Sequence, residues 1–181
     1  MRPFQLDWRG YHLRYDAEAL RAHRNPLPPL ERFQQPKAVL CQHARRGVAW
    51  LDAGGTYVTK DVYPIALPKR RGVEGAAVLV ALLNSRVFSV LYHLLYRGIA
   101  IGGGYLHFLP VFLHEVPIPR IDGETAARLA EQVLALQEAP TAEAFEALDE
   151  DVMDQYGLTG EERDAVRTFA DRCLGYDTAL S

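Results

Sequence analysis

The sequence predicts an α+β fold: a twisted, mostly antiparallel sheet near the front of the chain, a long central helix and a C-terminal acidic helical subdomain. Three observations support it. Short apolar segments separated by glycine and proline fill the first part, leucines recur every three or four positions in the middle, and acidic amphipathic segments follow. The chain has 181 residues, 49% hydrophobic and 24% charged, which is typical of a globular protein and excludes fibrous and disordered classes.

The N-terminal region combines a strand, a helical turn and a break. In residues 11–15, tyrosine and leucine alternate with histidine and arginine, which is the period of a half-buried strand. A short helical turn is expected over residues 17–23. Residues 25–29, Asn-Pro-Leu-Pro-Pro, then interrupt regular structure because proline lacks a backbone donor.

A basic β-meander is expected next. Its predicted strands are 38–42, 48–51, 56–59 and 62–67. Residues 43–47 would form the first connecting turn, and the paired glycines of residues 52–55 the second, because glycine adopts positive φ at little cost. Pro64 predicts that the last strand is an edge strand or carries a bulge.

Residues 75–97 predict the central helix, because their apolar residues follow three- and four-residue spacing. Asn84 and Ser85 lie in its middle and could cap a second helical segment. Beyond Gly98 come a glycine triplet at residues 102–104, a short aromatic segment and the extended Val-Pro-Ile-Pro sequence.

The C-terminal region predicts three helices with apolar faces. Gly157 is placed to end the second of them in the left-handed conformation. Thr159 and Glu162 have the spacing of a capping box for the third. Residues 1–120 are therefore expected to form the sheet and central helix, and residues 121–181 a helical unit packed on them or on another domain.

Charge divides the chain unevenly. Residues 1–72 carry 13 Lys and Arg against 6 Asp and Glu, a net charge of +7. Residues 73–120 carry 3 against 2, a net of +1, and residues 121–181 carry 4 against 15, a net of −11. A basic front indicates a polyanionic partner for that half, with the acidic helices turned away from it. The alternative is that the acidic helices simply have solvated faces.

Most catalytic and metal-binding signatures are absent from the sequence. It has no nucleophile elbow, no phosphate loop and no histidine pair with ligand spacing, and we expect a flexible or closely approaching loop at residues 102–104. His93 is expected to pack within the apolar helix, and the acidic cluster at residues 149–151 to be solvated. The longest apolar stretch, residues 73–96, contains two charged residues, so we expect no membrane span and a cytoplasmic location.

The basic sheet carries the side chains that suit nucleic acid. Arginine binds phosphate or the guanine edge, glutamine suits adenine, and tyrosine contacts sugars or stacks. The candidate DNA-contacting residues are Gln42, His43, Arg45, Arg46, Tyr57, Lys60, Lys69, Arg70 and Arg71, with Tyr105 and His107 as a second group. Two alternatives stay open: turns of soluble proteins are commonly basic, and Tyr105 could belong to the core together with Phe108.

The order of several segments along the chain is similar to a known family. The segments are 35–42, 48–52, 63–69, 82–88 (Leu-Leu-Asn-Ser-Arg-Val-Phe), 104–108, 116–119 (Val-Pro-Ile-Pro) and 153–162, which contains Tyr-Gly-Leu-Thr. Together they resemble the TaqI-like C-terminal specificity domain of type IIG restriction-modification DNA adenine methyltransferases. Specificity subunits of type I systems share the Leu-Asn-Ser helix and the Pro-Ile-Pro feature, and are the nearest relatives to exclude.

This resemblance implies a target recognition domain that binds double-stranded DNA and reads its sequence while the target base leaves the stack. In such proteins a methyltransferase domain, in the same or a separate chain, binds S-adenosylmethionine. The sequence lacks that domain's cofactor loop and its Asn-Pro-Pro-aromatic motif, so no cofactor and no enzymatic activity are expected of this chain alone. Rival hypotheses are a protein-interaction module that uses the acidic helices and a small enzyme built from scattered histidines.

Overall fold

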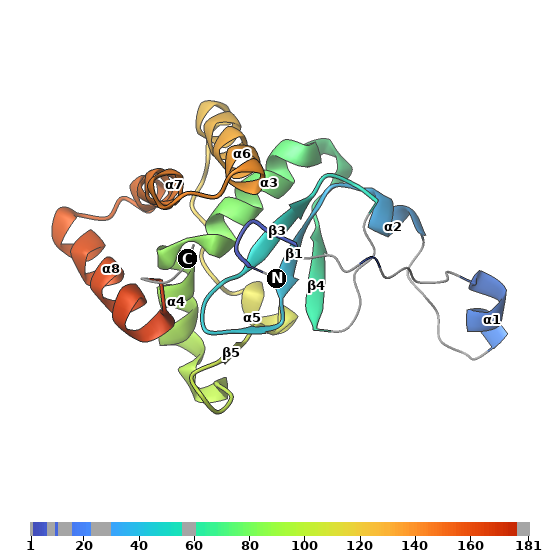
Figure 1. The fold of residues 1–181 in the computed structure, drawn as a ribbon, viewed down its shortest axis with the longest axis horizontal. Coiled ribbons are helices and arrows are strands. Elements are labelled where there is room, and N and C mark those ends of the chain that lie inside the picture. The colour runs from blue at the N-terminus through green and yellow to red at the C-terminus, as the bar shows by residue number, and fades with distance from the viewer. Residues whose placement is uncertain (1, 7–9, 11–15, 23–29, 56–60, 177–181) are drawn as a thin grey trace.

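The fold is an α+β architecture in which helices cover a small antiparallel sheet (Figure 1). The structure, a computed structural model, describes residues 2–6, 10, 16–22, 30–55 and 61–176. The strands are β1 (Lys37–Cys41), β2 (His43–Ala44), β3 (Ala49–Asp52), β4 (Val62–Ala66) and β5 (Leu106–His107). The helices are α1 (Ala17–Ala22), α2 (Leu30–Gln34), η1 (Lys69–Arg71), α3 (Gly72–Asn84), α4 (Arg86–Tyr96), η2 (Arg97–Ile99), α5 (Pro110–Leu113), α6 (Gly123–Glu138), α7 (Ala142–Gln155) and α8 (Gly160–Leu174). The predicted strand at residues 11–15, the break at 25–29 and the strand at 56–59 lie outside the described residues.

The main sheet has the strand order β3-β1-β4, so the predicted meander is wrong in its pairing. β4 runs back beside β1, with Tyr63 opposite Leu40, and does not continue outward from β3. The reason is burial: Ala38, Val39 and Leu40 are fully buried, and such a strand is most stable with a partner on each side. β4 is half-exposed and contains Pro64, which fits the predicted edge position.

Residues 43–47, expected as a simple turn, contain the short strand β2. It pairs antiparallel with β5, with His43 opposite His107 and Ala44 opposite Leu106, and forms a separate two-stranded sheet. The partner strand is more than sixty positions away in the chain, so the local sequence pattern around residue 43 contained no sign of it. This small sheet becomes the centre of the candidate site.

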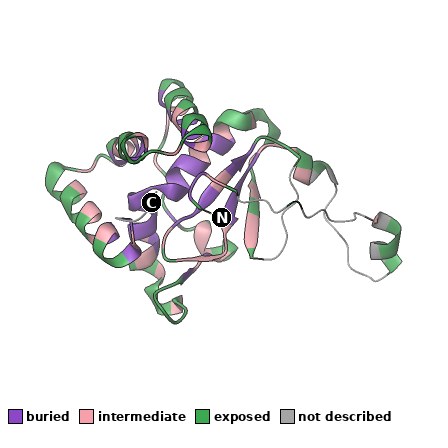
Figure 2. Ribbon diagram, viewed as in Figure 1, coloured by how far each residue is buried: buried purple, intermediate pink, exposed green. Residues whose placement is uncertain are grey.

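Helix α3 forms the centre of the core and lies between the main sheet and α6 (Figure 2). Its small residues Ala76, Ala77 and Ala81 are fully buried, which lets the neighbouring backbones approach closely. Leu129, Val133 and Leu136 of α6 pack into the same core as the sheet residues. The three acidic helices are therefore continuous with the core of the sheet region.

The predicted central helix divides at Ser85. Its Oγ accepts a hydrogen bond from the backbone N–H of Phe88 at 3.1 Å and caps α4, as expected from the sequence. Asn84, 1% exposed, turns its carboxamide to β3: Oδ1 accepts from Ala49 N at 2.8 Å, and Nδ2 donates to Ala49 O at 3.0 Å. The Leu-Asn-Ser motif thus joins a helix junction to the outer edge of the sheet.

A second amide closes the same edge. Gln137 of α6 accepts a hydrogen bond from Leu51 N at 2.8 Å and donates to Leu51 O at 3.3 Å. Edge strands leave backbone donors and acceptors unpaired, which invites pairing with another chain. Here the side chains of Asn84 and Gln137 take the place of a further strand along β3.

The predicted features of the C-terminal helices are confirmed. Thr159 and Glu162 form a capping box at the start of α8, and Gly157 has a φ of 66° just after α7. His93 packs its ring against Phe169 with centroids 5.2 Å apart, at the contact between α4 and α8.

One part of the acidic cluster is buried, contrary to the expectation of a solvated cluster. Asp149 is 1% exposed and accepts hydrogen bonds from the backbone N–H of Arg86 at 2.8 Å and from its guanidinium at 2.9 Å. Burial by itself would lower the pKa of Arg86, but hydrogen bonds to Glu146 and Asp149 outweigh it and raise that pKa above its usual value. Asp149 therefore anchors α7 to the α3–α4 junction.

Among the described residues, no single helix is both long enough and apolar enough to cross a membrane. The segments 69–84 and 86–99 are long and apolar enough only when taken together, and the chain bends by 62° between them. Much of this pair is buried in the core.

Candidate nucleic-acid interface

The candidate interface centres on the small sheet, which we call the β2–β5 ribbon: residues 42–45 together with residues 105–107. Backbone hydrogen bonds fix its position, because Gln42 N donates to Asp61 O at 2.8 Å and Gln42 O accepts from Phe108 N at 2.9 Å. Phe108 is fully buried beneath it, which settles that residue as core, whereas Tyr105 is 45% exposed. The ribbon is thus a surface feature held on a buried aromatic base.

Tyr92 of α4 supports the ribbon from below. Its hydroxyl donates to His107 O at 2.7 Å and accepts from Leu109 N at 3.1 Å. Burial raises the pKa of Tyr92 above its ordinary value, so the hydroxyl stays protonated and able to donate. A side chain from α4 therefore fixes the position of β5 relative to the core.

Three polar side chains of the ribbon meet one from β4. The rings of His43 and His107 lie with centroids 4.4 Å apart at an interplanar angle of 37°. Gln42 Nε2 donates to the hydroxyl of Tyr63 at 2.7 Å and lies 3.1 Å from His107 Nε2. We call Gln42, Tyr63 and His107 the amide triad. All three are half-buried, so the fold orders their side chains before any ligand arrives.

Arg45 is exposed at the tip of the ribbon and lies over the Tyr105 ring, 5.8 Å from its centroid. Ile101 N donates to Tyr105 O at 2.7 Å, and the glycine triplet forms the turn between them, with Gly103 and Gly104 at φ of 85° and 80°. The triplet thus makes a tight loop that presents Tyr105 to the solvent.

Arg46 is separated from Arg45 by the fold. Its guanidinium donates to the carbonyl oxygen of Gly175 and lies 4.6 Å from the centroid of the Tyr176 ring. Tyr176 is 4% exposed and bonded through its hydroxyl to Ser89 at 2.7 Å. The two neighbouring arginines, expected to act together, therefore lie in different surroundings: Arg45 is exposed, and Arg46 contacts Gly175 and Tyr176, which follow α8.

The remaining sequence candidates do not join the ribbon. Lys69, Arg70 and Arg71 are exposed in η1, which follows β4. β4 ends at Ala66, opposite Lys37, whereas the ribbon begins just after the other end of β1. η1 and the ribbon therefore lie at opposite ends of the main sheet (Figure 1). Tyr57 and Lys60 lie outside the described residues. Within the described residues, the exposed basic candidates therefore form two separate groups, Arg45 on the ribbon and the three residues of η1.

Two members of the site were missed from the sequence. Tyr63 lies on β4 and reaches the ribbon only because β4 pairs with β1, a topology that the meander prediction did not contain. Arg97 is exposed in η2, which contacts β5. An arginine that follows a helix commonly has only the structural role of a cation near the helix C-terminus, so its sequence position carries no sign of the site.

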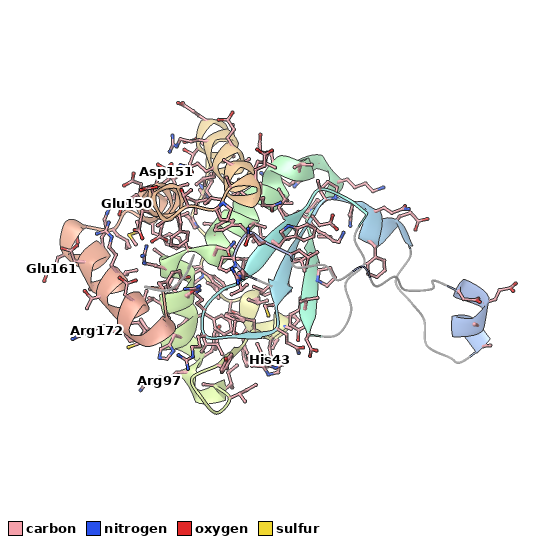
Figure 3. The ribbon with its side chains drawn as sticks, viewed as in Figure 1. His43, Arg97, Glu150, Asp151, Glu161 and Arg172 are labelled. Atoms are coloured by element: carbon pink, nitrogen blue, oxygen red, sulfur yellow. The ribbon has the colours of Figure 1, made fainter. Side chains whose placement is uncertain are left out.

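The labelled acidic side chains of α7 and α8 lie away from the ribbon, whereas the exposed residue Asp61 adjoins Gln42 through its carbonyl oxygen. Figure 3 shows His43 and Arg97 at the lower side of the molecule, Glu150 and Asp151 at the upper left on α7, and Glu161 at the left on α8. Many of these carboxylates are paired within the helical unit. The ion pairs join Arg128 to Asp151, Arg163 to Glu150 and Asp154, and Arg167 to Glu150 and Asp164.

The described residues contain no group of three or more histidine, cysteine, aspartate or glutamate side chains that could hold a metal ion. What the site offers is hydrogen-bonding and stacking chemistry: an amide triad, two imidazoles, an exposed arginine over a tyrosine, and a second arginine nearby. These groups suit the recognition of phosphates and base edges.

The fold and the site define a small α+β domain that presents a basic, aromatic two-stranded ribbon, with its acidic helices on another side. The chain belongs to the family of TaqI-like C-terminal specificity domains, whose match covers residues 1–118. Membership supports a role in target recognition within restriction-modification systems, as the resemblance implied. The match ends before α6, so α6, α7 and α8 lie beyond it. No curated protein matches the sequence.

Proposed function

We propose that this chain is the DNA target recognition domain of a restriction-modification adenine methyltransferase of type IIG, and that it binds duplex DNA through the β2–β5 ribbon. The observation that carries this proposal is the ribbon with the exposed Arg45 over the Tyr105 ring in a member of the TaqI-like specificity family. The ribbon lies away from Glu150, Asp151 and Glu161, so these carboxylates of the acidic helices do not face a polyanion that approaches it.

The shape of the ribbon suits a groove of DNA. The major groove of B-form DNA is about 12 Å wide and admits a two-stranded ribbon. In this arrangement the amide triad would lie against base edges, while Arg45 and Arg97 would contact phosphates on either side. Tyr105 offers a ring and a hydroxyl to the sugar-phosphate backbone.

The second basic group, η1, would contact phosphates further along the duplex. β4 separates it from the ribbon by five residues, or about 16 Å at the usual rise of roughly 3.3 Å per strand residue. That spacing is close to half a turn of the double helix, which repeats about every 34 Å. Lys69, Arg70 and Arg71 therefore suit a separate phosphate contact and carry no base information.

Methyl transfer in this proposal belongs to another domain, in the same or a separate chain, that binds S-adenosylmethionine. The role of this chain's residues is to hold the duplex and to fix the position of the target adenine while that base leaves the stack. Hydrogen bonds from Tyr92 to His107 O and from Phe108 N to Gln42 O fix the backbone positions of the two residues that would contact base edges. A rigid ribbon loses little conformational entropy on binding.

The experiment that tests this proposal is fluorescence anisotropy of the chain with a mixed-sequence DNA duplex at 50 and 200 mM salt. We expect a dissociation constant on the order of 10⁻⁴ to 10⁻⁶ M for non-specific binding. Two phosphate contacts, from Arg45 and Arg97, predict roughly a tenfold loss of affinity between the two salt concentrations, and added contacts from η1 a steeper one. Absence of binding at 50 mM salt would contradict the proposal.

A further inference from the structure

The amide triad restricts what Gln42 offers to a ligand. A free glutamine presents a carbonyl acceptor and two N–H donors, and it normally binds adenine through one of each. Here Nε2 donates to the Tyr63 hydroxyl at 2.7 Å and lies 3.1 Å from His107 Nε2. Because an amide nitrogen can only donate, this second contact requires the His107 tautomer that carries its ring proton on Nδ1 and accepts at Nε2. Both donors of the carboxamide are therefore used inside the protein.

We infer that Gln42 acts as a single hydrogen-bond acceptor and reads an exocyclic amino group in the major groove, either N6 of adenine or N4 of cytosine. Guanine and thymine present only acceptors at the corresponding positions, and these would face the Gln42 oxygen unfavourably. Tyr63 is the positioning residue, because its hydroxyl takes one of the amide protons. This inference rests on the proposed function and names the base chemistry that the ribbon recognises.

The backbone geometry makes the inference testable without loss of the ribbon. Gln42 is held by its own N–H and carbonyl, which bond to Asp61 and Phe108. Substitution of its side chain leaves both bonds in place. His107 is likewise fixed by the Tyr92 hydroxyl on its carbonyl oxygen.

The test begins with selection of preferred duplexes from a random-sequence library by the wild-type chain and by three variants. Gln42→Ala removes the acceptor and is expected to abolish the preference at one base position. Gln42→Glu keeps an acceptor and no donor, so the same base preference persists although overall affinity falls. Tyr63→Phe frees one amide proton, so the position additionally admits bases that present acceptors.

Base analogues then identify the atom that is read. At the Gln42-dependent position, adenine is replaced by purine, which lacks the N6 amino group, or cytosine by 2-pyrimidinone, which lacks the N4 amino group. The loss of one hydrogen bond is expected to weaken wild-type binding by about fivefold to tenfold and to leave binding of Gln42→Ala unchanged. An effect of purine identifies adenine as the recognised base, and an effect of 2-pyrimidinone identifies cytosine.

Two results would overturn the inference and are distinct from each other. If the wild-type chain binds duplexes and the preferences of Gln42→Ala are the same at every position, Gln42 reads no base, and the proposed function still stands. If the wild-type chain binds no duplex at all, the proposed function fails and this inference fails with it.

Discussion

Replacing Asn84 by alanine should destabilise the fold strongly, because its carboxamide closes the outer edge of β3. Asn84 accepts from Ala49 N and donates to Ala49 O, and it is 1% exposed. The substitution leaves Ala49 N buried without an acceptor, whereas Ala49 O keeps a hydrogen bond from Phe4 N at 3.0 Å. A buried unsatisfied donor costs about 1–3 kcal/mol, and the lost side-chain bond about 1 kcal/mol more.

The expected loss in the free energy of unfolding is therefore about 2–4 kcal/mol, a large part of the roughly 5–15 kcal/mol that stabilises a typical domain. The assay is urea unfolding followed by circular dichroism, with the midpoint compared at a constant slope. Gln137→Ala is the matched control: it removes the same pair of bonds from Leu51, but Gln137 itself is half-buried, so its removal should admit water to Leu51 N, and a loss of about 0.5–1 kcal/mol is expected. Equal losses from the two variants would refute the reasoning.

Two further predictions follow from local geometry. Gly47→Ala should prevent folding, because an added Cβ would lie 1.7 Å from the Leu83 carbonyl oxygen, whereas Gly98→Ala, with open space around it, should unfold at nearly the wild-type urea concentration. In acid, stability should fall through the caps of α6 and α8: backbone hydrogen bonds from Thr125 and Thr159 lower the pKa values of Asp122 and Glu162, respectively. Their contribution is present above the unfolded pKa of about 4 and is lost as the pH falls through the folded values, so Glu162→Gln should flatten the acid limb of stability against pH.

Local features of this fold could be predicted from the sequence because they depend on residues close together in the chain. The cap at Ser85 and the capping box of Thr159 and Glu162 follow from side chains that bond to backbone three residues away. The edge position of β4 followed from Pro64. In the two caps the side chain and its backbone partner lie within one helical turn, and in β4 the missing backbone donor belongs to Pro64 itself.

The features that prediction missed depend on pairing between distant segments. β2 is recognisable only beside β5, and the reach of Tyr63 to Gln42 depends on β4 lying beside β1. Arg45 and Arg46 are identical in type and adjacent, and only the tertiary contact with Tyr176 distinguishes them. Asp149 differs from its acidic neighbours because it lies on the buried face of α7 with Leu148 and Val152, where Arg86 lies opposite it. Charge composition indicated a basic half, but which of its residues belong to the β2–β5 ribbon depends on the tertiary fold.

The measurement that tests the central claim most directly is duplex binding by two charge-reversal variants in the anisotropy assay. Arg45→Glu changes an exposed arginine on the ribbon, and Arg172→Glu makes the same change at an exposed position on α8. We predict that Arg45→Glu weakens binding at 50 mM salt by about tenfold, through a lost phosphate contact and a new repulsion, while Arg172→Glu changes it by less than about twofold. Equal losses from the two variants would show that net charge, and not the β2–β5 ribbon, governs binding, and would contradict the account.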